Sequence, residues 1–276
     1  MPALYRRFLA PEVSNRLQTF LLVIVSAFSA ILPVNAQSTP SKPLAIAAAS
    51  DLQFALPQIA SAYARATGNT VTVTYGSSGN LSAQIANGAP FHILLSADAT
   101  YPRQLISQGN AAADSLTFYA RGSLVVWFAT VPKADPTIAA LDSPDIKHIA
   151  IANPKHAPYG RAAEAALRSA GIYDQISSKL VLGQNIAQAV QFVDSGNADA
   201  GLVALSLLQA SSSQHRGIWK LVPLDSYPPL DQAAVVTQVG ARNPNSAAFI
   251  AFLKSSESQA ILQRFGFRPP STESKK

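Results

Sequence analysis

Small, hydroxyl-bearing turns follow several predicted strands at the points where helices should begin. They are Ala49-Ser50-Asp51, Gly76-Ser77-Ser78-Gly79 and His156-Ala157-Pro158-Tyr159-Gly160, with Asn185-Ile186 as a fourth candidate. Helix N-termini offer unpaired backbone N–H groups and a partial positive charge, and small residues let an anion approach them closely. The first two turns contain no lysine or arginine. One such turn is more often a plain helix cap, but together they predict capture of a small anion by neutral dipoles.

Catalysis and metal binding are not expected from the remaining reactive side chains. Ser50 and Ser78 do not lie in a Gly-x-Ser-x-Gly elbow, and no paired base is suggested. The histidines are scattered without ligand spacing, at positions 92, 148, 156 and 215. Asp51 has two interpretations: a carboxylate that stabilises a helix N-terminus, which we favour, or an acceptor for a protonated anion. We therefore expect a binding protein that is not an enzyme and needs no cofactor or metal.

The elements that position these turns alternate between strand and helix patterns. β-branched or continuous apolar runs predict strands at 44–48, 70–75, 93–95, 124–129, 149–151, 180–182, 200–203 and 233–239. Apolar stripes with helical spacing predict helices at 52–66, 80–87, 102–108, 161–170, 186–193 and 246–265, the last with a break near Ser255-Ser256. In open α/β sheets, ligands bind beyond the carboxyl ends of the strands, where the four turns lie.

This alternation predicts an α/β protein of two lobes, each a mostly parallel sheet flanked by helices. There are too many strand–helix units for one simple sheet, and no long linker separates two independent domains. We place the chain crossings near Arg121-Gly122 and Leu230-Asp231. Lobe 1 would then comprise residues 37–121 plus 231–276, and lobe 2 residues 122–230.

The N-terminal segment has the pattern of a cleaved export signal. Arginines precede an uncharged apolar run from Phe20 to Val34, which is short for a membrane span and ends in Val34-Asn35-Ala36. We expect residues 1–36 to be removed and the protein to be free in the periplasm, with Sec export favoured over twin-arginine export. A retained membrane anchor is the alternative.

Composition narrows the possible partners. The chain has no cysteine, so disulfides, thiolate metal sites and a lipid-modified N-terminal cysteine are excluded. The net charge is +6, and it falls to about +4 without the signal segment. The basic residues are scattered, whereas nucleic-acid-binding proteins cluster them. We expect no nucleic-acid partner and a monomer.

Spaced motifs occur in one order along the chain and carry a family resemblance. They are Ala47-Ala48-Ala49-Ser50, Tyr75-Gly76-Ser77-Ser78-Gly79, Leu95-Ser96-Ala97-Asp98, Ala152-Asn153-Pro154-Lys155-His156-Ala157-Pro158-Tyr159-Gly160, Ala198-Asp199-Ala200-Gly201-Leu202-Val203 and Phe265-Gly266-Phe267. Over nearly the whole mature chain they resemble the molybdate-binding proteins of molybdate ABC transporters. The resemblance implies the type II periplasmic binding fold, capture of molybdate or tungstate between two lobes, and delivery to an inner-membrane ABC permease.

The resemblance also assigns ligand-binding residues. Ser50 and Ser78 match two hydroxyl donors of the first lobe, and Tyr159 and Ile186 match backbone N–H donors of the second. Ala204 stands where many members carry a ligand-binding tyrosine, so that donor is missing or replaced, for example by the Tyr159 hydroxyl. His92 stands where the family often has aspartate, a difference that concerns packing more than binding.

Several alternatives compete with this interpretation. A tetrapyrrole-forming deaminase of the same architecture would need a cysteine, and a transcription factor's effector domain would follow a helix-turn-helix instead of a signal segment. A periplasmic sensor subunit stays open. Sulfate, phosphate and ferric ion are rival ligands, although no Tyr-Tyr pair typical of ferric sites occurs.

Overall fold

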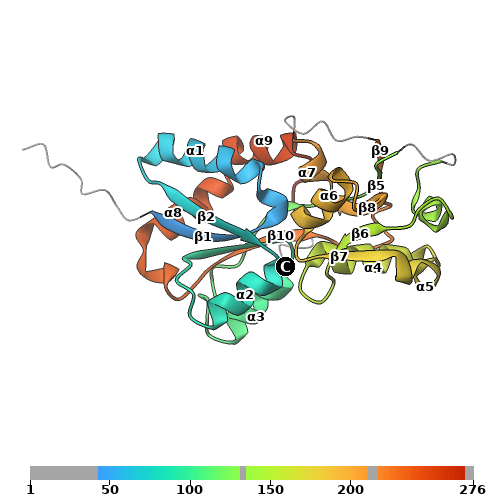
Figure 1. The fold of residues 1–276 in the computed structure, drawn as a ribbon. Helices are drawn as coiled ribbons and strands as arrows, with labels where there is room; N and C mark the ends of the chain where they lie inside the picture. Colours follow the sequence, from blue (N-terminus) through green and yellow to red (C-terminus); the bar gives the residue numbers. More distant parts are fainter. Residues whose placement is uncertain (1–42, 131–134, 211–216, 271–276) are drawn as a thin grey trace, which may run out of the picture. The chain divides into compact units, whose positions relative to one another are not determined.

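The computed structural model describes residues 43–130, 135–210 and 217–270. These residues belong to one compact unit, which contains two five-stranded sheets with helices packed against them (Figure 1). The predicted signal segment lies outside the described residues. Within the described ranges, no helix has the length and apolarity needed to cross a membrane.

The first sheet has the strand order β2-β1-β3-β10-β4. Its strands are β1 (Leu44–Ala49), β2 (Val71–Gly76), β3 (Ile93–Ser96), β4 (Thr117–Arg121) and β10 (Asp231–Val236). Its helices are α1 (Ala55–Thr67), α2 (Ser78–Ala86), α3 (Thr100–Ser107), α8 (Pro244–Leu253) and α9 (Ser256–Arg264).

Alternating side chains of β1 contribute to the cores on both faces of this sheet. Ile46 and Ala48 join the core under α1, α8 and α9, whereas Ala47 joins the core under α2 and α3. Figure 1 shows α1 with α9 on one side of the sheet and α2 with α3 on the other. Because successive residues of a strand point to opposite faces, a strand covered on both sides has a continuous apolar run.

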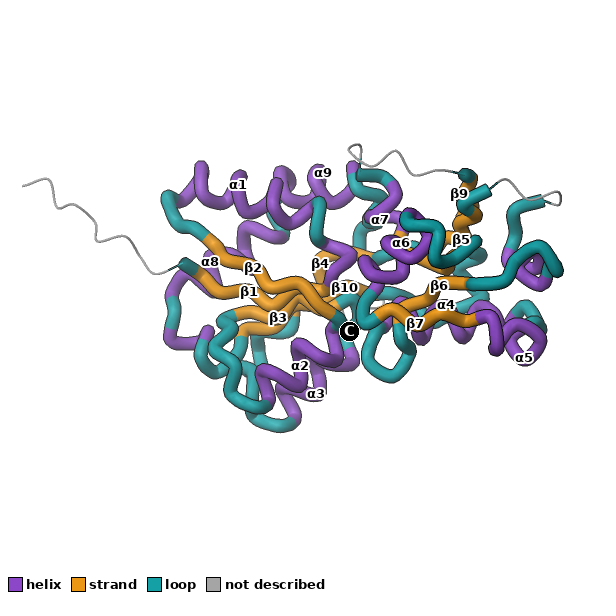
Figure 2. The backbone as a smooth tube through the Cα atoms, in the orientation of Figure 1, coloured by secondary structure: helices purple, strands orange, loops and turns teal. Residues whose placement is uncertain are grey.

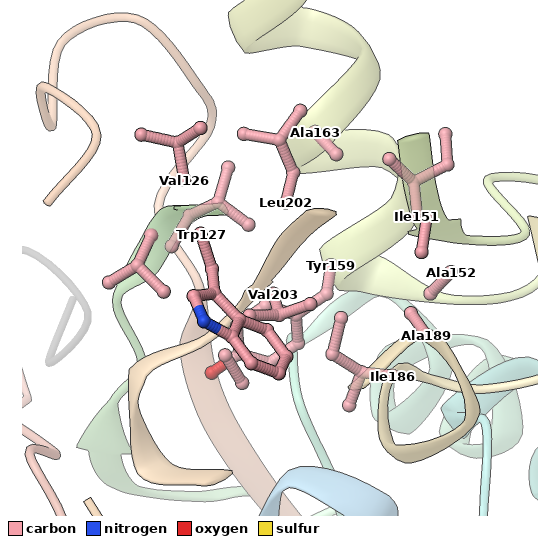
Figure 3. Close-up of a cluster of buried hydrophobic side chains, with 14 of the residues drawn as sticks. Val126, Trp127, Ile151, Ala152, Tyr159, Ala163, Ile186, Ala189, Leu202 and Val203 are labelled. Atoms are coloured by element: carbon pink, nitrogen blue, oxygen red, sulfur yellow. The ribbon is translucent and has the colours of Figure 1, made fainter. Parts of the chain in front are cut away.

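The second sheet has the order β7-β6-β8-β5-β9. Its strands are β5 (Leu124–Phe128), β6 (Ile149–Ala152), β7 (Leu180–Gly183), β8 (Ala200–Ala204) and β9 (Ile218–Leu221). Its helices are α4 (Pro158–Ser169), α5 (Tyr173–Ile176), α6 (Ile186–Asp194) and α7 (Leu205–Leu208). A single core contains Trp127 and Leu202 together with residues of α4 and α6 (Figure 3).

The predicted two-lobed α/β fold is confirmed, but the sheets are mixed and not mostly parallel. Among the described strands, each sheet has two parallel and two antiparallel pairings. The antiparallel pairings involve β5 and β10, which enter their sheets directly after the chain passes from one sheet to the other. No strand–helix–strand crossover fixes their direction. β4 and β9 were not predicted, because they are edge strands whose burial is incomplete.

The predicted break in the C-terminal helix is confirmed. α8 ends at Leu253, α9 begins at Ser256, and the Ser255 side chain caps α9 by accepting a hydrogen bond from Ser258 N. The first helix differs from its prediction because a short 3-10 helix, η1 (Ser50–Leu52), precedes α1.

We predict that Leu202→Ala destabilises the protein far more than Leu221→Ala. Leu202 is fully buried on the central strand β8, whereas Leu221 on the edge strand β9 is 53% exposed. Truncation in a packed core costs about 2–5 kcal/mol, and an exposed substitution about 0.5 kcal/mol or less. Urea unfolding of the two variants checks this, and equal losses would contradict the assignment of the core.

Candidate anion-binding site

The four predicted ligand-binding residues lie around one small cavity. Ser50 follows β1, Ser78 follows β2, Tyr159 lies beyond β6, and Ile186 lies beyond β7. The cavity wall also includes Ala49, Asp51, Gly76, Ser77, Ala97, Ala157 and Pro158. Figure 2 shows these strands of both sheets running toward the junction between the sheets. The carboxyl ends of strands from two sheets thus meet at one place.

Local sequence places each of these residues in the first turn of a helix. Ser50 begins η1, and Ser78 is the first residue of α2, which Ser77 caps by accepting from Asn80 N. Tyr159 follows Pro158 at the start of α4, a position where proline is favoured. Ile186 begins α6, whose cap is Asn185. Backbone N–H groups in a first turn have no partner within their own helix.

The serine hydroxyls have different hydrogen-bond partners. Ser78 is fully buried, and its Oγ accepts from Ala97 N at 3.0 Å, which leaves the hydroxyl proton available for an acceptor. Ser50 Oγ donates to Asn185 Oδ1 at 3.2 Å and accepts from Ala187 N at 3.3 Å. Both Ser50 contacts join the first sheet's loop to α6. Ser50 must therefore exchange Asn185 for an anion before it can donate to one.

The side chains of Tyr159 and Ile186 are buried in the second lobe's core (Figure 3). A methyl group at Gly122 would collide with the Tyr159 hydroxyl, so this hydroxyl lies against the connection between β4 and β5. That position does not favour the hypothesis that it replaces the family's tyrosine at Ala204. Ala204 itself is fully buried at the end of β8 and is not among the residues of the cavity wall.

Neutral dipoles surround the cavity. Of the described residues that line it, none is lysine or arginine, and Asp51 carries the one formal charge. Within the same described ranges, no group of three or more His, Cys, Asp or Glu residues could hold a metal ion. An anion bound here would contact hydroxyls and backbone N–H groups.

The Asp51 side chain is buried in the cavity wall and is hydrogen-bonded to β10, the strand with which the chain returns to the first sheet. Its Oδ2 accepts from Gln232 Nε2 at 2.8 Å, and Gln232 Oε1 accepts from the Tyr119 hydroxyl at 3.1 Å. Its backbone oxygen accepts from Ser206 Oγ at 2.8 Å. The Tyr159 hydroxyl also interacts with the Asp51 carboxylate, although within the described residues neither this hydroxyl nor Asp51 Oδ1 makes a hydrogen bond of normal geometry. The carboxylate therefore does more than stabilise a helix start.

Burial controls the ionisation of these groups. It raises the pKa of Asp51 from 3.8 to about 6, although the hydrogen bond from Gln232 opposes the rise. Burial and the nearby Asp51 also raise the pKa of Tyr159 well above its usual value of 10. The Tyr159 hydroxyl is therefore protonated at neutral pH.

Several contacts near the cavity join the two lobes. The sequence did not predict these contacts. Ser77 Oγ lies 2.9 Å from His156 Nδ1, and Gly79 N donates to His156 O at 2.9 Å. Arg161 of α4 reaches Asp98 of the first lobe. Within the first lobe, His92 accepts from Ala45 N through Nδ1 at 2.8 Å and so positions the start of β1. Long-range pairs such as these leave no local signal in the sequence.

Comparison with known proteins identifies the class of protein to which the chain belongs. A family model described as bacterial extracellular solute-binding protein matches residues 44–268, and the chain belongs to this family, in its molybdate-binding branch.

Relatives at 39% and 40% identity define that branch. The chain is 40% identical to the molybdate-binding protein ModA of Rhodobacter capsulatus over 210 residues, which are 76% of this chain and 82% of the relative. It is 39% identical to the ModA of Azotobacter vinelandii over 222 residues, 80% of this chain and 88% of the relative. The solved structure of the Azotobacter vinelandii periplasmic molybdate-binding protein matches with a TM-score of 0.78 at 34% identity, covering 83% of this chain and 100% of that chain. The resemblance seen in the motifs is thereby confirmed.

A more distant structure shares the fold alone. The sulfate-binding protein SubI of Mycobacterium tuberculosis matches with a TM-score of 0.69 at 15% identity, over 84% of this chain and 88% of that chain. The match to SubI therefore concerns the fold and not the ligand.

We predict that the stability difference between the wild type and Asp51→Asn depends on pH. The folded-state pKa of Asp51 lies above the unfolded value, so protonation favours the folded protein. That advantage is complete below about pH 4 and is lost as the pH rises through about 6. The wild type should lose about 2–3 kcal/mol relative to the variant between about pH 4 and pH 7. Urea unfolding of both proteins across this range measures the difference, and a difference independent of pH would contradict the burial of an ionisable Asp51.

Proposed function

We propose that this chain is the periplasmic receptor of an ABC importer and that it binds molybdate or tungstate between its two lobes. The observation that carries this proposal is the cavity in which helix starts from both lobes converge without a basic side chain. The molybdate-binding relatives support the same ligand class.

The donor set suits a tetrahedral dianion. Such an anion presents only acceptors, and removing it from water is tolerable only if its oxygens are hydrogen-bonded. Ser50 and Ser78 supply hydroxyls, and the first turns at Tyr159 and Ile186 supply backbone N–H groups. Bonds to a charged acceptor are about twice as strong as neutral ones, so a few oriented dipoles can replace salt bridges.

The remaining assignments follow from this role. The protein acts without catalysis, cofactor or direct protein–metal bonds, as a monomer that passes its anion to an inner-membrane permease. Residues 1–36 direct export to the periplasm and are removed. Lobe 1 comprises residues 37–121 plus 231–276, and lobe 2 residues 122–230. The connection between β4 and β5 at positions 122 and 123, and the start of β10 at position 231, support these limits.

We predict that Ser78→Ala weakens molybdate binding about 10- to 150-fold, because a hydrogen bond to a charged group contributes about 1.5–3 kcal/mol. The matched control is Ser82→Ala, the same substitution of another buried serine on α2 that is not part of the cavity wall. Isothermal titration calorimetry should show near wild-type affinity for the control. Equal affinities of the two variants would remove Ser78 from the site.

The test of the proposed function is a thermal-shift panel of oxyanions on the chain from Gln37 onward. Molybdate and tungstate at about 1,000 times their dissociation constants should add roughly 4 kcal/mol, or about 8–16 °C in Tm. Phosphate near neutral pH carries an O–H that needs an acceptor, and an unpaired buried donor costs about 1–3 kcal/mol. Phosphate should therefore give no comparable shift.

The same panel on Asp51→Asn tests the carboxylate among the described residues that line the cavity. If phosphate gave the larger shift in the wild type and lost it in Asp51→Asn, the carboxylate would be the key acceptor and the molybdate assignment would be wrong. If sulfate gave the largest shift, the receptor role would stand with a different ligand.

A further inference from the structure

An arginine of α4 crosses from the second lobe to the first beside the cavity. Arg161 Nη1 donates to the Tyr101 hydroxyl at 2.9 Å, and Nη2 pairs with Asp98 Oδ2. The guanidinium also lies 5.2 Å from the centre of the Tyr101 ring. Asp98 follows β3 and Tyr101 is on α3, so one side chain makes three kinds of contact across the junction between lobes.

The partners of Arg161 are held in place within the first lobe. Asp98 Oδ1 accepts from Thr100 N at 3.1 Å at the start of α3, which leaves Oδ2 for Arg161. The Asp98 side chain is 15% exposed and that of Arg161 is 37% exposed. A pair that is partly removed from water is less screened than a surface pair. The contact can therefore contribute to the free energy of the closed arrangement of the lobes.

The contacts around this pair are tight. A methyl group at Gly79 would lie 2.7 Å from both the Tyr101 hydroxyl and His156 O. Gly79 belongs to the first lobe and His156 to the second, so the two lobes touch directly beside Arg161. The pair therefore lies between a direct contact of the lobes and a pocket that both Asp98 and Arg161 line.

Arg161 shares its helix with a predicted anion donor but does not line the cavity. Tyr159 and Arg161 both lie in the first turn of α4, and of the two only Tyr159 belongs to the cavity wall. Any rigid movement of α4 that brings the Tyr159 N–H to an anion also brings the guanidinium to Asp98 and Tyr101. Contacts made only in one conformation raise its population and slow escape from it.

We propose that Arg161, Asp98 and Tyr101 form a latch between the lobes that sets the lifetime of the closed anion complex. The proposal rests on the proposed function, because the anion is assumed to leave through the opening of this contact between the lobes. Arg161 is a positioning residue here: it acts on the conformation of the lobes and not on the anion.

The kinetic test uses Arg161→Gln, Asp98→Asn and the double variant of the mature chain. Radiolabelled molybdate is chased with unlabelled molybdate to measure dissociation. Each single variant should dissociate about 5- to 30-fold faster than the wild type, with association changed by about 2-fold or less. The double variant should be no faster than the faster single variant, because the two residues act as one unit.

The matched control is Arg168→Gln. Arg168 is on the same helix, but its ion pair is with Glu164 of α4 and its ring contact is with Tyr173, both in the second lobe. This variant should keep the wild-type dissociation rate. If Arg161→Gln behaves like Arg168→Gln, the latch is wrong and the anion-binding role is unaffected.

A second measurement needs no anion. Because the chain contains no cysteine, Gln84→Cys on α2 and Ser169→Cys on α4 provide two exposed positions for spin labels, one in each lobe. Electron–electron distance distributions of Arg161→Gln should move toward longer separations than those of Arg168→Gln. Identical distributions would overturn the latch, and this result holds even if the wild type binds none of the oxyanions.

Discussion

Removal of a dianion from water is the constraint on which the rest of this structure depends. Every oxygen of such an anion needs a donor, because an unpaired buried charge costs many kilocalories per mole. Backbone N–H groups in first helical turns are donors that need no long, flexible side chain. One helix start could not surround a tetrahedron, so several must converge. The junction between two sheets brings together the starts of η1, α2, α4 and α6.

The Asp51 carboxylate opposes the binding of an anion. Its carboxylate is buried beside a site suited to anions, and it is bonded to Gln232 of β10. The hydrogen bond links the loop after β1 to the strand that begins where the chain returns to the first sheet. Burial, together with this carboxylate, raises the pKa of Tyr159, whose hydroxyl lies at Gly122 in the other connection between sheets. Asp51 and Tyr159 therefore connect the site to both segments in which the chain passes between the sheets.

The parts of this arrangement that the sequence predicted all have local signals. The turns that hold Ser50, Ser78, Tyr159 and Ile186 follow apolar strands and begin helices, which is a local signal. The resemblance to molybdate-binding proteins then singled out these residues within the turns. The mixed sheets could not be predicted, because the direction of β5 and β10 depends on how the chain passes between sheets. The pairs Asp51–Gln232 and Arg161–Asp98 join residues that are 181 and 63 positions apart. Such pairs depend on tertiary structure, which no local pattern encodes.

The anion is expected to bind in the cavity at Ser50 and Ser78. The most direct test is anomalous X-ray diffraction from crystals of the mature chain grown with tungstate. We predict one dominant tungsten peak in the cavity, with anion oxygens at about 2.7–3.2 Å from both serine hydroxyls and from the N–H groups at Tyr159 and Ile186. A dominant peak elsewhere, for example in the neighbouring pocket lined by Arg103, Arg121 and Arg161, would contradict it.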